Sequence, residues 1–255
     1  MLGSGRSGTS LLAGLFNNNE VFSGHRLWPP TVSNPLGYFE DEEVNYINED
    51  LLDKVAPWRP RGVAGALWPL HRDRPRYTQR WLSTLPTGTA IHSDSALDAR
   101  MARLTSVRPY LFKDPRFCYT LSAWTPHLAV GTVYLCVFRE PQRTVNSIMR
   151  VVRQERYLRD LSLSVEAACR YWEAAYRSVL HQRSAIGGEW LFMHYDEILE
   201  GRAVRILEDR LDASADRDML RADLKRSAML GEVTQSAQRL YQELVELAKS
   251  KYPLP

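Results

Sequence analysis

The stretch GSGRSGTS, residues Gly3–Ser10, follows the apolar pair Met1-Leu2 and leads into a helical apolar pattern over residues 9–16. A short strand, a glycine-rich turn and a helix in this order are typical of the first βα unit of a parallel α/β fold. Only two residues precede Gly3, so the first strand is either unusually short or begins upstream of Met1. The loop therefore predicts the fold class and, within it, a turn that binds anions.

Short apolar runs alternate with amphipathic patterns along the chain, which predicts a parallel sheet covered by helices on both faces. The run VYLCVF is the clearest strand, since a continuous apolar run is typical of a strand buried on both faces. We expect a single domain over residues 1–255 with a three-layer α/β/α fold. Its central, mostly parallel sheet has about five strands, as in P-loop NTPases. The expected strands are Met1–Leu2, Val21–Phe22, Tyr110–Phe112, Val133–Phe138 and Trp190–Met193, and the expected helices are Thr9–Phe16, Asp41–Asp53, Pro141–Val152, Val165–Leu180 and Gln235–Lys249.

The composition is that of an ordinary globular protein, with 44% hydrophobic and 25% charged residues. No run approaches the roughly 18 apolar residues of a membrane span, and no signal-peptide pattern is visible, so we expect a cytoplasmic protein without a membrane span. Lysine supplies only five of the 33 basic residues. Arginine's planar fork suits phosphate and sulfate, although many of these arginines also fit solvated helix faces. The sequence contains no basic run with interleaved aromatic residues, so we expect no nucleic-acid partner.

The cysteines and histidines give no sign of a metal or disulfide framework. Cys118, Cys136 and Cys169 are widely spaced and form no CxxC pair, so we expect buried, reduced thiols. The six histidines show no metal-ligand spacing such as HExxH. We therefore predict a site without metal.

The sequence departs at two positions from that of a P-loop protein that binds nucleoside triphosphates. Gly3, Gly8 and Ser10 have the spacing of a P-loop, but Thr9 occupies the lysine position and the cation is Arg6 instead. A magnesium-binding acid is also expected after a neighbouring strand, yet VYLCVF is followed by Arg139. Both changes favour anion binding without metal. The alternative interpretation of the loop is a P-loop kinase that acts on a small molecule.

A second cationic element follows the strongest strand. Arg139 ends the strand, and Ser147 comes eight residues later, two turns into the next predicted helix. An arginine and a hydroxyl in this arrangement can hold one phosphate group from two sides. Without such a ligand, Arg139 would simply pair with a surface acid.

Four segments together resemble one enzyme family. GSGRSGTSLL over 3–12 and FREPQRTVNS over 138–147 resemble the two nucleotide-binding signatures of the sulfotransferases that use 3′-phosphoadenosine-5′-phosphosulfate (PAPS). KDPR over 113–116 is similar to a segment of bacterial and protein-tyrosine sulfotransferases, and HYDEIL over 194–199 resembles the family's YEDL segment. The resemblance covers about residues 1–200 in the same order. The RKGxxGxW segment of the cytosolic animal enzymes has no match here.

The resemblance implies a sulfotransferase that moves a sulfuryl group from PAPS to a sugar, alcohol or phenol and releases 3′,5′-ADP. A non-catalytic nucleotide-binding protein of the same fold is a further alternative. The loop would hold the 5′-phosphosulfate, Arg139 and Ser147 the 3′-phosphate, and Lys113 would stabilise the bridging oxygen. Catalysis of this kind depends on positioning and on neutralising the leaving group. The implied nucleotide-binding residues are Gly5, Arg6, Ser7, Gly8, Thr9, Ser10, Arg139, Ser147 and Tyr195.

The acceptor hydroxyl needs a general base, and two residues are candidates. His25 lies in SGHRLWPP, and Glu40 lies in NPLGYFEDEE, whose GYFED segment recurs in similar bacterial sequences. Each also has a structural interpretation, His25 as a loop histidine and Glu40 as an acid favoured at a helix start. His92 and Asp94 are weaker candidates.

The acceptor pocket is the least defined part of the sequence. Residues 57–109 are rich in proline, tryptophan and arginine and form either a cover over the substrate or a structural cap. The sequence does not indicate an oligomeric state. Aromatic residues that would line an aromatic or sugar pocket, or else the core, are Trp28, Tyr38, Phe39, Trp58 and Trp68.

Overall fold

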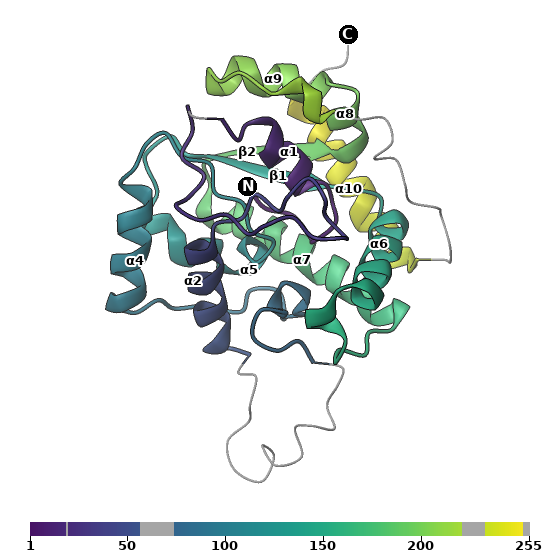
Figure 1. The fold of residues 1–255 in the computed structure, drawn as a ribbon. Coiled ribbons are helices and arrows are strands. Elements are labelled where there is room, and N and C mark those ends of the chain that lie inside the picture. Colours follow the sequence, from purple (N-terminus) through teal and green to yellow (C-terminus); the bar gives the residue numbers. More distant parts are fainter. Residues whose placement is uncertain (19, 57–73, 221–232, 252–255) are drawn as a thin grey trace.

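The computed structural model describes residues 1–18, 20–56, 74–220 and 233–251, and Figure 1 shows their arrangement. The two strands are β1 (Val133–Phe138) and β2 (Glu189–His194). The helices are α1 (Thr9–Leu15), α2 (Glu42–Asp53), α4 (Ser95–Thr105), α5 (Phe117–Trp124), α6 (Pro141–Gln154), α7 (Val165–Ile186), α8 (Tyr195–Leu199), α9 (Arg202–Leu211) and α10 (Gln235–Lys251). Single turns of 3-10 helix are η2 (Arg80–Leu82), η3 (Thr125–His127), η4 (Arg156–Leu158) and η5 (Arg217–Met219).

The strands β1 and β2 form a parallel pair, in register from Val133 opposite Glu189 to Phe138 opposite His194. Because side chains alternate along a strand, each strand supplies apolar residues to both faces of the sheet. Helices α6 and α7 connect the two strands, as a parallel connection requires. The predicted strands at 133–138 and 190–193 are therefore confirmed.

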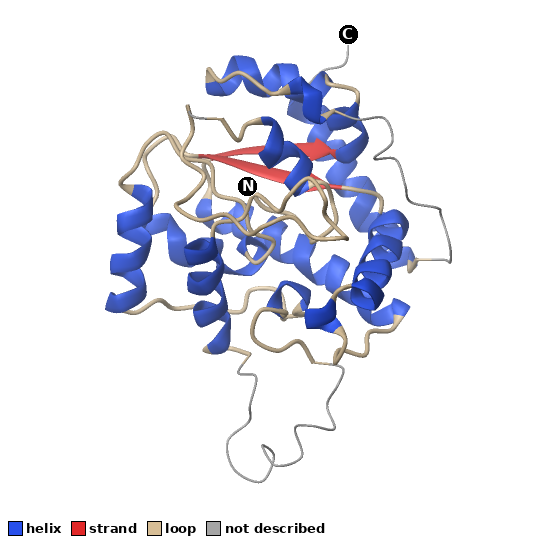
Figure 2. Cartoon of the chain, in the orientation of Figure 1, coloured by secondary structure: helices blue, strands red, loops and turns tan. Residues whose placement is uncertain are grey.

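Helices cover both faces of this small sheet. On one face, Cys136 and Phe138 belong to a buried cluster with residues of α2, α4, α5, α6, α7 and α10. On the other face, Leu135 and Val137 belong to a second buried cluster with residues of α1, α8 and α9. Figure 2 shows the two strands between these groups of helices. The α/β class is thus confirmed, with the sheet in the middle.

The sheet of about five strands does not form in the described residues. Leu2 makes one parallel bridge to Cys136, and Phe22 makes one to Tyr110, in place of the three other expected strands. The amino group of Met1 donates to the carbonyl of Phe112 at 2.7 Å, so these segments do lie side by side. The runs are too short to extend the ladder: the glycine loop follows Leu2 at once, and a proline, which has no N–H to donate, precedes Tyr110. A P-loop fold is therefore not what these residues show.

All five predicted helices are present, but three further helices of eight or more residues, α4, α5 and α9, were not assigned from the sequence. The sequence of α5, FCYTLSAW, is almost wholly apolar, so it has no period that separates a helix from a strand. Helix α4 lies in the segment 57–109 that was left unassigned. Its N-cap is Asp94, whose Oδ1 accepts hydrogen bonds from the amides of Ala96 and Leu97. The acid that was a weak catalytic candidate is a helix cap.

Two predictions from composition can be compared with the structure. Cys118, Cys136 and Cys169 are buried and unpaired, which confirms the expectation of free thiols. Burial raises the pKa of the Cys118 thiol to about 12, so it stays protonated. Among the described helices none is both long enough and apolar enough to cross a membrane.

Candidate functional site

The glycine loop is packed so closely that its glycines are required. A Cβ on Gly3 would lie 2.2 Å from the carbonyl oxygen of Val137, and one on Gly5 would lie 2.4 Å from the ring of Trp81. Gly8 has φ +101°, and a Cβ there would meet the ring of Tyr195 at 2.3 Å. The loop is thus fixed against the end of β1 and the start of α8.

Two tyrosines of α7 hold the loop through hydrogen bonds to its backbone. The amide of Gly5 donates to the hydroxyl of Tyr171 at 2.6 Å, and the amide of Ser4 donates to the hydroxyl of Tyr176 at 3.3 Å. The Tyr176 hydroxyl also lies 2.8 Å from Ser7 Oγ and 2.9 Å from the carbonyl oxygen of Val137. Burial raises the pKa of both tyrosines, so both stay neutral. Sequence reasoning missed them, because in the sequence they belong to the apolar stripe of α7.

Arg6 connects the loop to two distant segments. Its φ is +71°, which is uncommon for a residue with a side chain and is held by the glycines around it. Its Nε donates to Ser147 Oγ of α6 at 3.2 Å, and an Nη donates to the carbonyl of Ser33 at 3.0 Å. Burial lowers the pKa of Arg6, although an arginine stays charged at neutral pH. The structure therefore brings the loop and Ser147 together, as the two sequence signatures require.

Arg139 is a buried cation whose hydrogen bonding is incomplete. It follows β1 directly, is only 6% exposed, and its guanidinium lies 4.2 Å from the ring centroid of Tyr195. Burial lowers its pKa, and its Nε is buried with no hydrogen-bond partner. A buried donor without a partner is costly. An anion bound beside Arg139 would supply that partner.

Lys113 and Glu40 form a buried ion pair next to the loop. Lys113 is 2% exposed, contacts Glu40 Oε1, and donates to Ser10 Oγ at 3.2 Å. Glu40 is placed there by its neighbour Asp41, whose Oδ1 accepts the amide of Val44 and so caps α2. A cation, a carboxylate and a hydroxyl from three separate segments thus meet at one point.

The rest of the KDPR segment forms the support of this point. Asp114 is fully buried and accepts hydrogen bonds from the side-chain amides of Asn45 and Asn48 at 2.8 and 2.9 Å. Arg116 donates to Asp114 at 3.1 Å and to Glu49 at 2.7 Å. Since a buried charge needs a partner, this network explains why the segment carries both an acid and an arginine. It was not expected from the sequence, because its partners lie on α2.

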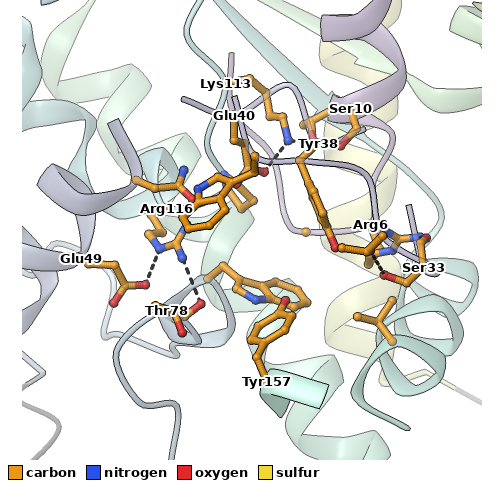
Figure 3. A pocket seen from close by; sticks show the side chains of 18 of the residues that line it. Arg6, Ser10, Ser33, Tyr38, Glu40, Glu49, Thr78, Lys113, Arg116 and Tyr157 are labelled. Atoms are coloured by element: carbon orange, nitrogen blue, oxygen red, sulfur yellow. Dashed lines mark hydrogen bonds and ion pairs between the residues drawn. The ribbon is translucent and has the colours of Figure 1, made fainter. Parts of the chain in front are cut away.

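Part of the glycine loop, the Lys113–Glu40 pair and Arg116 border one cavity of about 480 Å³, which Figure 3 shows from close by. In that view Glu40, Lys113 and Ser10 lie on one side of the cavity and Tyr157 lies on the opposite side. Arg139, Ser147 and Tyr195 do not line it, and Arg6 connects it to them. The lining residues are Gly5, Arg6, Thr9, Ser10, Trp28, Pro29, Thr31, Ser33, Tyr38, Glu40, Asn45, Tyr46, Glu49, Thr78, Trp81, Lys113, Pro115, Arg116, Val151 and Tyr157.

The other candidates from the sequence lie elsewhere. The His25 side chain is exposed and stacks edge-on against Phe22, and its backbone amide donates to Asp41. His92 is exposed as well. Of the aromatic candidates, Trp28 and Tyr38 line the cavity, Phe39 does not, and Trp58 and Trp68 lie outside the described residues. Only Glu40, of the two proposed bases, reaches the cavity.

The comparisons with known proteins leave the site to be interpreted from its own residues. No protein-family model, no curated protein and no solved structure matches the chain. In the part of the chain that the structure describes, no group of three or more His, Cys, Asp or Glu side chains is placed to hold a metal ion. The prediction of a site without metal stays a prediction.

Proposed function

We propose that this protein is a sulfotransferase that moves a sulfuryl group from PAPS to a hydroxyl acceptor and releases 3′,5′-ADP. One observation carries the proposal: Lys113 pairs with Glu40 and donates to Ser10 Oγ at 3.2 Å, beside the glycine loop and at the border of a cavity. Sulfuryl transfer needs a cation for the leaving oxygen and a base for the acceptor. Lys113 and Glu40 are groups of these two kinds.

The polar groups around the loop fit the two ends of PAPS, which supplies a sulfuryl group on a phosphate leaving group. Arg6, Thr9 and Ser10 border the cavity and would hold the phosphosulfate end. The 3′-phosphate would lie against Arg139 and Ser147, where the Nε of Arg139 is buried without a partner. Charge-assisted hydrogen bonds to phosphate satisfy such a donor. The proposed donor thus accounts for an atom that the protein alone leaves unpaired.

The residues also account for the proton and the charge. Glu40 would accept the acceptor's hydroxyl proton as the acceptor oxygen forms a bond to sulfur. The bond between sulfur and the bridging oxygen then breaks, and its electron pair stays on the leaving phosphate, where Lys113 neutralises the charge. Glu40 is favoured over His25 as the base because His25 is exposed and does not line the cavity.

Thermal shift with three nucleotides tests the proposal. At a ligand concentration 100-fold above Kd, binding stabilises a protein by about 2.7 kcal/mol, or roughly 5–10 °C for a chain of this size. We expect this shift with 3′,5′-ADP and little shift with 5′-ADP or Mg-ATP. Stabilisation by Mg-ATP alone would contradict the proposal and favour a P-loop kinase. Binding of 3′,5′-ADP without sulfuryl transfer to any alcohol or phenol would favour a non-catalytic protein.

Arg139→Ala tests the assignment of the 3′-phosphate. The variant should lose the preference for 3′,5′-ADP over 5′-ADP, because the buried cation is removed. Arg153→Ala is the matched control, since Arg153 is an exposed arginine near the end of α6, the helix that begins two residues after Arg139. Titration calorimetry with both nucleotides gives the ratio of the two Kd values. An unchanged ratio in Arg139→Ala shows that the 3′-phosphate binds elsewhere.

A further inference from the structure

Aromatic rings form part of the walls of the cavity. Five rings line it, and they come from separate parts of the chain: the segment before α2, α2 itself, η2 and η4. Two of them, Trp28 and Tyr46, pack edge to face with centroids 6.2 Å apart. Aromatic walls favour flat ligands, which stack on ring faces or meet ring edges. The five rings are those of Trp28, Tyr38, Tyr46, Trp81 and Tyr157.

Most of the charged and polar side chains at the border are already engaged by other protein groups, although Nε1 of Trp28 is buried without a partner. Glu49 accepts from Arg116 at 2.7 Å, and Glu40 pairs with Lys113. The hydroxyl of Tyr38 lies 2.7 Å from Thr31 Oγ1. A ligand that carries hydroxyls on every edge would leave many of them without a partner here, and burying an unpaired hydroxyl is unfavourable. The lining therefore disfavours a sugar.

The size of the space is that of a small organic molecule. Pockets for drug-sized ligands range over roughly 300–1,000 Å³, and this cavity measures about 480 Å³. Glu40, Lys113 and Ser10 lie at one end and Tyr157 lies on the opposite side, as Figure 3 shows. The two arginines that also line the cavity, Arg6 and Arg116, already donate to protein acceptors. A ligand with one hydroxyl at one end and an apolar body fits this distribution.

We propose that the cavity binds a flat aromatic alcohol, with a single ring or two fused rings, as the sulfuryl acceptor. Its hydroxyl would point toward Glu40, and its ring system would lie among the aromatic side chains of the walls. That this hydroxyl is sulfated rests on the function proposed above. The binding of the ring system does not, because it depends only on the walls.

Binding of two matched probes tests the inference. The probes are 2-naphthol and methyl β-D-glucopyranoside, each titrated by calorimetry into the full chain with and without 3′,5′-ADP. We expect 2-naphthol to bind at least 20-fold more tightly than the glucoside, and to yield naphthyl sulfate when PAPS is present. Tighter binding of the glucoside, or no binding of 2-naphthol, overturns the inference.

A variant on the side of the cavity away from the loop shows where the probe binds. Tyr157 is 42% exposed, so Tyr157→Ala should fold, and it should weaken 2-naphthol binding at least fivefold with the affinity for 3′,5′-ADP unchanged. Tyr77→Ala is the control, because Tyr77 is 37% exposed and does not line the cavity. Equal 2-naphthol affinity in wild type and Tyr157→Ala means that the probe binds elsewhere and overturns the inference.

The two proposals fail in different ways. If 2-naphthol binds and 3′,5′-ADP does not, the class of ligand for the cavity stands and the sulfotransferase proposal fails. If 3′,5′-ADP binds, 2-naphthol does not, and PAPS sulfates an aliphatic alcohol or a sugar, the sulfotransferase proposal stands and the acceptor class is wrong.

Discussion

Lys113 is almost completely buried, and its ammonium group contacts two polar side chains. It contacts the carboxylate of Glu40 and donates to the hydroxyl of Ser10. Removing one partner of a buried pair leaves the other charge uncompensated, at a cost of about 3–5 kcal/mol. A test of Glu40 must therefore keep a hydrogen-bonding group at position 40, so that loss of activity is not loss of folding.

Glu40→Gln should lower the rate of sulfuryl transfer roughly 10²- to 10⁴-fold, the range for loss of a general base. Glutamine keeps an oxygen that can accept from Lys113, and the nucleotide-binding residues are untouched, so binding of 3′,5′-ADP should be retained. The measurement is the turnover of PAPS with 2-naphthol, together with the Kd for 3′,5′-ADP. Glu40→Asp, which keeps the carboxylate but shortens it, should recover part of the rate.

His25→Ala is the comparison for this prediction. The His25 side chain is exposed and outside the cavity, so near-full turnover is expected. If His25→Ala loses the activity and Glu40→Gln keeps it, the base has been assigned to the wrong residue.

Single residues were predictable from the sequence where their chemistry is unusual for their position. Arg6 is the cation of a loop that lacks the P-loop lysine, and Arg139 stands where an acid is expected. Both residues could therefore be predicted as candidates for anion binding. Glu49 and Arg116 differ: their importance lies in a contact of 2.7 Å between α2 and the segment after Tyr110–Phe112. No local pattern reports such a contact, since acids and arginines are common on helix surfaces.

At the scale of elements, α7 positions the glycine loop as well as packing on the sheet. Its two tyrosine hydroxyls accept the amides of Ser4 and Gly5, which removes two donors from the set that a ligand meets. The proposed binding of the phosphosulfate by this loop would then depend on side chains such as Arg6 and Ser10 more than on these amides. The two tyrosines therefore position the loop, and neither of them lines the cavity.

Tyr176→Phe should weaken binding of 3′,5′-ADP roughly tenfold, because the loop loses a hydrogen bond that positions it. A tenfold change in Kd corresponds to about 1.4 kcal/mol. The free energy of unfolding should also fall by about 1–3 kcal/mol, since the amide of Ser4 is left buried without its partner. Calorimetry with 3′,5′-ADP and urea unfolding measure the two effects.

Tyr119→Phe distinguishes positioning from stability. Tyr119 of α5 is also buried, and its hydroxyl donates to the carbonyl of Ser83 at 2.8 Å, away from the loop. This variant should lose similar stability with an unchanged Kd for 3′,5′-ADP. Equal loss of affinity in both variants would assign the effect to general destabilisation and not to the loop.

Element types were predictable where the pattern was long and periodic, as in α6 and α7, or continuously apolar, as in β1. The prediction of the three remaining strands was wrong. Each of these runs is only two or three residues long and takes part in a single parallel bridge instead of a ladder. Helix α4 was missed although Ser95–Thr105 begins with a clear cap, Asp94, because it lies in the segment 57–109, whose many proline, tryptophan and arginine residues give no clear pattern.

At the scale of the whole molecule, the sheet joins two apolar clusters that share no helix. The cluster with α9 contains Leu207, and the cluster with α10 contains Leu244, and neither side chain is exposed. The sequence predicted helices on both faces of a sheet, but not how small the sheet is. Among the described residues, β1 and β2 are the strands that contribute to both clusters. With so little sheet in between, the two clusters should not unfold separately.

Leu207→Ala and Leu244→Ala should therefore each lower the free energy of unfolding by about 2–5 kcal/mol, the range for a buried leucine, within one common transition. The sheet couples the two faces, so a cavity on either side weakens the same folded state. Urea unfolding followed by circular dichroism and by tryptophan fluorescence measures this, and the two signals should coincide in both variants. Val130→Ala is the control, with a change below about 0.5 kcal/mol, because Val130 is fully exposed. Two separate transitions, of which each variant shifts only one, would show that the faces fold independently and that residues 1–255 do not form a single domain.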